Sequence, residues 1–388
     1  MNVLFPEADR VVRSAGFIRL EGRARSIGRV GVDGPVDVVA IASLALILTL
    51  LAAPAYAELD PAEEITSAGV EVQVAEEPTD PTVASIPGTP IGVRFGEPLE
   101  GIRFRVAYAY ERIEKRGLRD SDRNISTSDV FGNLAPPVYT RAPRALTVDV
   151  HTLQLAYAPH PRFTLVVEVP FLRKRLDTST VAGVETRATT HGIGDVGLAL
   201  VVPFIRKKHE RSQIHIGLDV PTGSVRRRKG GARRPYDSQL GSGTVDLEWG
   251  LTYRGQLRRW SWGGQFIGRH PIGMNDLDYR EGSRFEASLW GGVGLFHGLR
   301  ASLRMDWQKQ NNTRVQGTDD ILLIVDPSDN AKIRGGTRVT ISPGLSLEVP
   351  RLEHQRIAIE FGLPIYQNLD GPQLERDWSL KAGWQWGF

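Results

Sequence analysis

The chain has 388 residues, of which 41% are hydrophobic and 24% charged, with 41 glycines, 24 prolines and no cysteine. The lack of cysteine excludes disulfide crosslinks, thiolate metal sites and a lipidated N-terminal cysteine. The net charge of +3 is uneven: residues 58–93 carry eight acidic side chains and no Lys or Arg, whereas residues 94–388 have a net charge of +10. A basic body suits anionic lipid or anionic solutes, and because no nucleic-acid-binding motif occurs, we expect no nucleic acid partner.

The N-terminus predicts an export signal. Residues 38–57 carry no charge, Arg25 and Arg29 precede them, and Ala55-Tyr56-Ala57 has the small-x-small pattern of a signal cleavage site. Residues 1–57 are therefore predicted to be an N-terminal extension with a cleaved signal peptide. The part before the apolar run is long, which a start codon assigned too far upstream would explain. An uncleaved membrane anchor of about 20 residues is the alternative.

Residues 58–99 are rich in Glu, Pro, Thr and Ala and show little hydrophobic periodicity. A segment of this composition has too few apolar side chains to bury a core. We predict a disordered, acidic and proline-rich linker that lies in the periplasm.

After residue 100 the sequence alternates between apolar side chains and polar or small ones. This period of two predicts strands with one face toward lipid and the other toward a polar lumen. Twelve such segments occur, each of about the 9–11 residues that a tilted membrane strand needs. They are residues 102–110, 146–157, 163–172, 196–205, 213–221, 244–254, 260–268, 284–295, 299–308, 338–349, 356–366 and 376–388.

The connections between these strands alternate between short and long. The short ones are residues 158–162, 206–212, 255–259, 296–298 and 350–355, and the long ones are 112–145, 173–194, 222–243, 269–283, 309–337 and 367–375. Short periplasmic turns and long external loops are typical of outer-membrane barrels. The sequence therefore predicts an all-β fold, a transmembrane antiparallel β-barrel of about 12 strands over residues 100–388, with both termini in the periplasm.

Aromatic side chains gather near the predicted strand ends. The final strand closes with Trp384, Trp386 and Phe388, and further aromatic residues fall near both rims, as in the girdles of membrane barrels. We expect the C-terminal Phe388 to be recognised by the barrel-assembly machinery. A soluble β-sandwich is the alternative, but it would not need aromatic residues on the apolar face at both rims.

The inward-facing positions of the predicted strands are heavily charged, with both signs present. They are Arg103, Arg105, Glu168, His215, Asp219, Asp246, Glu248, Arg254, Arg284, Glu286, Arg300, Arg304, Asp306, Arg338, Glu360 and Lys381. These groups could line a narrow polar pathway or a solute site, or they could form ion pairs that close the lumen. The sequence leaves both alternatives open, because charges in a low-dielectric lumen need partners in either case.

One predicted external loop holds the densest run of basic residues. Its members are Arg226, Arg227, Arg228, Lys229, Arg233 and Arg234. Arginine pairs well with phosphate, so we expect contact with the phosphates of outer-membrane lipid or lipopolysaccharide. A solvated loop without a partner is the alternative.

The sequence offers weak support for enzyme chemistry. Gly192-Ile-Gly194-Asp-Val-Gly197 matches a dinucleotide-binding pattern but leads into a strand, with no helix N-terminus for a phosphate. The eight histidines have no metal-ligand spacing, and no G-x-S-x-G motif occurs. No catalytic residue, metal site or cofactor is predicted.

Three glycine-rich segments, Gly192-Ile-Gly-Asp-Val196, Leu218-Asp-Val-Pro-Thr-Gly223 and Gly241-Ser-Gly-Thr-Val-Asp246, flank predicted strands. Together they resemble the outer-membrane transporter-like family named after the MetA pathway of phenol degradation. The resemblance covers most of residues 100–388. It implies a Gram-negative β-barrel that transports aromatic or other hydrophobic compounds. From the residues alone, the glycines mark loop-to-strand transitions that need backbone freedom.

These observations predict an outer-membrane channel or transporter, porin-like in type, for passive passage of small molecules. The first alternative is a closed barrel that acts as a scaffold and binds a periplasmic or surface partner through the linker or the loops. An outer-membrane enzyme is a third and weaker alternative.

Overall fold

The computed structural model describes residues 88–99, 101–132, 139–229, 232–296, 298–316, 325–349 and 354–388. The predicted signal peptide and residues 58–87 of the predicted linker lie outside the described residues. No helix in the described part of the chain has the length and apolar character needed to cross a membrane.

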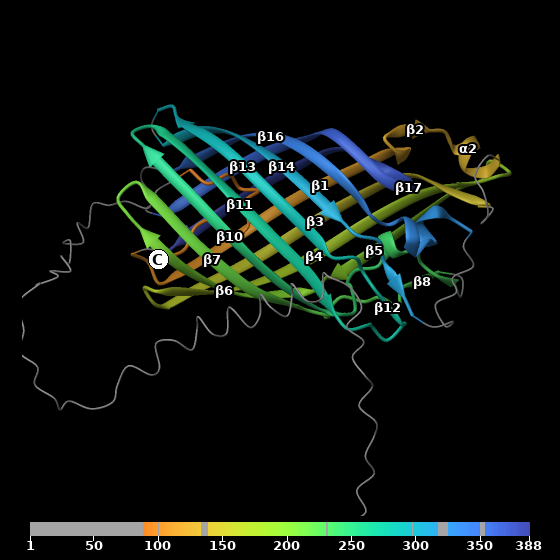
Figure 1. Ribbon diagram of the computed structural model, residues 1–388, viewed down its shortest axis with the longest axis horizontal. Helices are drawn as coiled ribbons and strands as arrows, with labels where there is room; N and C mark the ends of the chain where they lie inside the picture. Colours follow the sequence, from red (N-terminus) through yellow and green to blue (C-terminus); the bar gives the residue numbers. More distant parts are fainter. Residues whose placement is uncertain are drawn as a thin grey trace, which may run out of the picture. The chain divides into compact units, whose positions relative to one another are not determined.

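Eleven strand elements of the described residues form one closed antiparallel ring (Figure 1). In chain order they are β1 (Phe104–Ser121), β3 (Arg141–His160), β4 (Phe163–Thr180), β6 (Val196–Arg206), β7 (Glu210–Val220), β10 (Val245–Leu257), β11 (Trp260–Ile272), β13 (Arg284–Gly294), β14 (Leu299–Gln310), β16 (Gly336–Glu348) and β17 (Gln355–Gly387). Each pairs with the next, and β17 pairs with β1, which closes the ring. The predicted all-β barrel is therefore confirmed.

The long strand β17 contains the last two predicted strands, residues 356–366 and 376–388. Its first part pairs with β16 and its last part with β1. The two parts lie side by side, because the Gly387 N–H donates to the His354 carbonyl at 3.1 Å and Phe361 stacks on Trp378 at 5.8 Å between ring centroids. The eleven elements thus supply the twelve barrel-length segments that the sequence predicts.

The barrel turns its apolar face outward. In β17 the side chains of Ile357, Ile359 and Phe361 are exposed, while those of Arg356 and Glu360 are buried. Other strands also place apolar side chains outside, which is the opposite of a soluble protein. Their large exposed side chains are mostly Leu, Ile, Phe, Tyr and Trp. This pattern is that of a barrel surrounded by lipid.

The start of β1 and the end of β17 meet at the rim where the short turns lie. Phe104 at the start of β1 stacks on Tyr157 and on Phe388, with ring centroids 4.7 and 5.6 Å apart. The Phe104 N–H donates to the Phe388 carbonyl at 2.9 Å. The C-terminal residue therefore belongs to the seam that closes the ring. Nearby aromatic side chains are exposed, namely those of Trp260, Trp262, Trp384 and Trp386.

At the opposite rim several strands are longer than predicted. Parts of the predicted loops 112–145 and 173–194 are strand, because β1 continues to Ser121, β3 begins at Arg141, and β5 (Glu185–Ile193) pairs with the end of β4. These extensions carry polar pairs such as Asp177–Arg187, joined at 2.7 Å. An alternation of apolar residues could not reveal them.

Short elements complete the long-loop rim. They are β2 (Arg123–Ile125), α2 (Thr127–Gly132), β8 (Arg228–Lys229), β9 (Ala232–Arg233), β12 (Tyr279–Arg280), β15 (Arg314–Val315) and the 3-10 turns η2 (Tyr236–Ser238), η3 (Pro327–Asp329) and η4 (Ala331–Ile333). Two small apolar clusters hold this rim together, one around Leu146 and Leu176, the other around Tyr236 and Tyr279.

Candidate functional site

The end of the predicted linker lies inside the barrel. Residues 88–99, here called the plug segment, make contacts with inward-facing groups of several strands. The Gln265 side chain of β11 donates to the Arg94 carbonyl at 2.6 Å, and the Phe95 ring meets the His215 ring of β7 at 4.9 Å. Arg105 of β1 donates to the Glu97 carbonyl at 2.8 Å. Because three strands of the ring separate β7 from β1, contacts with both place the plug segment in the lumen.

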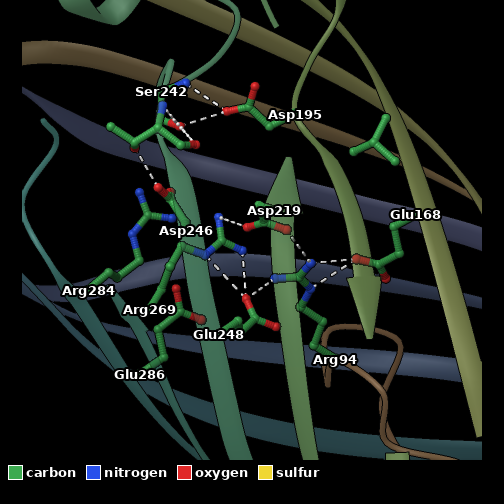
Figure 2. Close-up of polar contacts among 12 residues, drawn as sticks. Arg94, Glu168, Asp195, Asp219, Ser242, Asp246, Glu248, Arg269, Arg284 and Glu286 are labelled. Carbon is green, nitrogen blue, oxygen red and sulfur yellow. Dashed lines mark hydrogen bonds and ion pairs between the residues drawn. The ribbon is translucent and has the colours of Figure 1, made fainter. Parts of the chain in front are cut away.

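Ion pairs fix the plug segment through Arg94 (Figure 2). Its guanidinium contacts Glu168 of β4 at 2.5 Å and Glu248 of β10. Arg269 of β11 binds the same Glu248 at 2.7 Å and Asp219 of β7 at 3.1 Å. We call these five side chains the Arg94 network. One cation of the plug segment thereby joins carboxylates of two strands that do not pair with each other.

A second ionic contact holds the other end of the plug segment. Glu97 accepts from Arg356 of β17 at 2.7 Å and from Gln385 at 3.2 Å. Arg356 also donates to the Thr89 carbonyl, so it joins two points of the segment. The Glu97–Arg356 pair is largely buried, and such a pair is costly to break on one side.

Gly92 brings the plug segment close to a third ion pair, Arg304 with Glu360. These two groups are 3.2 Å apart, and Arg304 also contacts Asp306. A Cβ atom at position 92 would collide with the Arg304 guanidinium and would lie 2.5 Å from Glu360 Oε2. A side chain at position 92 would therefore have to displace either these two side chains or the plug segment itself.

A cavity of about 650 Å³ remains beside the plug segment. Ten of the sixteen predicted lumen residues line it: Arg105, Glu168, Asp219, Asp246, Arg284, Glu286, Arg304, Asp306, Glu360 and Lys381. Three more, His215, Glu248 and Arg254, are buried within the barrel.

Of the other three predicted lumen residues, Arg300 and Arg338 make contacts on the inner side of the barrel, whereas Arg103 does not. Arg300 is near Glu348 at 3.9 Å, and Arg338 is bonded to glutamines of neighbouring strands. Arg103 is exposed, because β1 begins only at Phe104 and the inward alternation does not extend to position 103.

The sequence analysis missed several charged groups of this site, namely Arg94, Glu97, Arg269, Arg356 and Arg376. Some signal was present for three of them. Arg94 is the first basic residue after the acidic segment, Arg356 has the same parity as the inward-facing Glu360, and Arg269 follows the predicted strand 260–268 by one residue. What the pattern lacked was a reason to place residues 88–99 inside the ring.

The three glycine-rich segments converge on one carboxylate. Asp195 accepts from the Gly223 N–H at 2.9 Å and from the N–H and hydroxyl of Ser242 at 2.7 and 3.0 Å. Gly223 and Gly241 are so close that a Cβ atom on Gly223 would lie 2.7 Å from the Gly241 Cα. These segments therefore form a brace between β6, β7 and β10.

Replacing Asp195 with alanine should lower the free energy of unfolding by about 1–3 kcal/mol, because three donors lose a charged acceptor. Denaturant titration of the refolded barrel measures this change. Asp276→Ala is the control, since the Asp276 carboxylate is 81% exposed and pairs with an exposed Arg226, and such pairs contribute little. Equal losses in the two variants would contradict the brace.

In the predicted basic loop, some arginines contact other protein groups and some are exposed. The Arg233 guanidinium lies between the rings of Tyr236 and Tyr279, at 4.9 and 4.7 Å from their centroids, and Arg234 donates to the Thr189 carbonyl at 2.8 Å. The side chains of Arg226, Arg227 and Arg228 are exposed, and Lys229 belongs to β8. Within the described residues, no cluster of three or more His, Asp or Glu side chains could hold a metal ion.

Comparison with solved structures identifies the fold class. The chain is similar to the COG4313 outer membrane channel from Pseudomonas putida F1, with a TM-score of 0.55 and 14% identity over 76% of this chain and 99% of that chain. A Pseudomonas aeruginosa FadL homologue matches with a TM-score of 0.38 and 9% identity over 74% and 91% of the two chains. No family model and no curated protein matches the sequence. The chain therefore has the fold of an outer-membrane β-barrel.

Proposed function

We propose that this protein is a channel for the passive passage of small molecules across the outer membrane of a Gram-negative bacterium. The observation that carries the proposal is a polar cavity of about 650 Å³ inside a closed ring whose outer surface is apolar. The similarity to an outer membrane channel supports the same assignment. In this arrangement both termini of the chain would lie in the periplasm. The exposed Arg226, Arg227 and Arg228 would contact lipid or lipopolysaccharide phosphates at the outer surface.

The plug segment would keep this channel closed at rest. It occupies the lumen through ion pairs and through Phe95 and Leu99, which belong to a cluster of buried apolar residues, and it has no regular secondary structure. Displacement of a short segment requires no change in the barrel ladder. We therefore expect passage of solutes to depend on movement of residues 88–99.

The polar lining favours hydrophilic or charged small molecules over the aromatic and hydrophobic compounds that the MetA-pathway resemblance implies. The cavity is lined by charged groups of both signs, including Arg105, Glu168, Asp246, Arg304 and Lys381. A hydrophobic solute would have to displace water from these groups at a cost in free energy. The membership of that family and the recognition of Phe388 by the assembly machinery stay predictions.

Proteoliposome swelling tests the proposal. Vesicles with a refolded variant that lacks residues 88–97 should admit small sugars and organic ions, with a rate that falls as solute size rises. Vesicles with the wild type should admit them more slowly, and protein-free vesicles should not admit them. The alternative is the closed scaffold, which the triple anchoring of the plug segment favours. A folded barrel that admits no solute, even after removal of residues 88–97, would support the scaffold instead.

A further inference from the structure

Three arginines near the cavity have no carboxylate in an ion pair with them among the described residues. They are Arg284 of β13, Arg338 of β16 and Arg376 of β17, here called the arginine cluster, and Arg284 and Arg376 line the cavity. We propose that the arginine cluster binds the carboxylate of small organic anions. The inference deepens the proposed function by naming a solute class, although binding itself does not require transport.

The polar partners of the arginine cluster are amides instead of carboxylates. Arg338 donates to Gln367 Oε1 at 3.0 Å and to Gln308 Oε1 at 3.3 Å, and Arg284 donates to Gln310 Oε1 at 3.2 Å. The Nε atoms of Arg284 and Arg376 are buried and have no hydrogen-bond partner among the described residues. A neutral amide oxygen satisfies a donor but leaves the cationic charge uncompensated.

Four other arginines of the lumen each have a carboxylate. Arg94 contacts Glu168, Arg269 contacts Glu248, Arg304 contacts Glu360 and Arg356 contacts Glu97. No ion pair among the described residues includes a member of the arginine cluster. These four positive charges around the plug segment are therefore neutralised, whereas those of the arginine cluster are not.

The charges around the cluster strengthen this contrast. Apart from burial, the groups that act on Arg338 are Arg376 and Arg284, and both are cations. The carboxylates that act on Arg376 are Glu111, Glu286 and Asp306.

Two of these carboxylates already have a cation. Glu111 lies 3.7 Å from Lys381, and Asp306 is bound by Arg304. Of these three carboxylates, only Glu286 has no ion pair among the described residues. Like charges in a low-dielectric space repel one another, so the cluster is stabilised by an added anion.

The strand register places the cluster on one part of the wall. Arg338 lies opposite Gln308 on one side and Gln367 on the other, and Gln310 lies opposite Arg284. In Figure 2 no hydrogen bond or ion pair joins Arg284 to a labelled carboxylate. Guanidinium groups bind the two oxygens of a carboxylate in a fork, which makes this solute class the best match.

Calorimetric titration of the purified protein in detergent, at constant ionic strength, tests the assignment. Succinate should bind saturably, and its uncharged diamide should not. Arg338→Gln should weaken succinate binding by about tenfold or more, because a charged hydrogen-bonding partner is lost. Arg376→Gln serves as the second variant if Arg338→Gln does not fold, as judged by circular dichroism.

The matched control is Lys174→Gln, which removes a positive charge from a cavity-lining side chain that donates to the Gln239 carbonyl and has no contact with the arginine cluster among the described residues. It should leave succinate binding within about twofold of the wild type. The inference is overturned if succinate does not bind, if inorganic phosphate binds and succinate does not, or if the control loses as much affinity as Arg338→Gln. Since no flux is measured, a barrel that binds succinate but admits no solute would refute the channel and leave the binding site standing.

Discussion

Replacing Arg94 with glutamine is expected to open the barrel. The substitution leaves Glu168 and Glu248 buried in the lumen without the cation that joins them. Breaking a buried ion pair on one side costs about 3–5 kcal/mol. If that cost falls on the closed state, the equilibrium between closed and open channels shifts by about two to four orders of magnitude.

Single-channel recording in a planar bilayer measures this effect as open probability. The control is Arg119→Gln, which breaks an ion pair of comparable geometry with Glu375, 2.7 Å, in a part of β1 that has no contact with the plug segment among the described residues. Arg119→Gln should conduct as the wild type does. An Arg94→Gln channel as quiet as the wild type would show that the Arg94 network does not hold the lumen closed.

Replacing Gly92 with valine should produce the same open channel without any change of charge. A side chain at position 92 collides with the Arg304 guanidinium, which Asp306 and Glu360 hold in place. Because these ion pairs oppose a shift of the Arg304 side chain, we expect the segment to move away from this wall. We expect the open probability to rise by at least about tenfold, the effect of a strain of roughly 1.4 kcal/mol on the closed state.

Gly291→Val is the matched control for this steric effect. Position 291 is an exposed site on β13, and a Cβ atom there meets no atom within 4 Å. This variant should fold and conduct as the wild type does. If Gly92→Val stays closed while its barrel is intact by circular dichroism, the close approach of residue 92 to Arg304 has no role in gating.

The transmembrane strands could be predicted from the sequence because lipid imposes a strict alternation on them. The segments 196–205 and 284–295 differ from β6 and β13 by only one residue. Beyond the lipid that constraint ends, so the polar extensions of β1, β3 and β4 went unpredicted. Long-range ladders such as β17 with β1 followed only from the requirement that the barrel close.

The site was less predictable than the barrel. Alternation indicated which side chains point inward, but it could not indicate which of them meet. Glu168 and Glu248 belong to strands that do not pair, and their connection depends on Arg94, which comes from a segment with too few apolar residues to suggest a buried position. Likewise, the glycine-rich segments showed a need for backbone freedom but not their convergence on Asp195.

The sequence left two alternatives for the charged lumen, a polar pathway and a set of ion pairs that closes it, and the structure has features of both. Ion pairs do fill part of the interior, around Arg94, Glu97 and Arg304. A polar cavity nevertheless remains beside them. The ion pairs and the cavity are compatible in one channel if the ion pairs hold the plug segment, which can move, instead of joining the barrel strands to one another.

The most direct test of this account is the single-channel conductance of the refolded protein compared with a variant that lacks residues 88–97. The account predicts rare and brief openings for the wild type, and steady ohmic steps for the variant because its lumen is no longer occupied. Equal conductance in the two proteins, or a correctly folded variant that stays silent, would contradict the claim that residues 88–99 close an otherwise open channel.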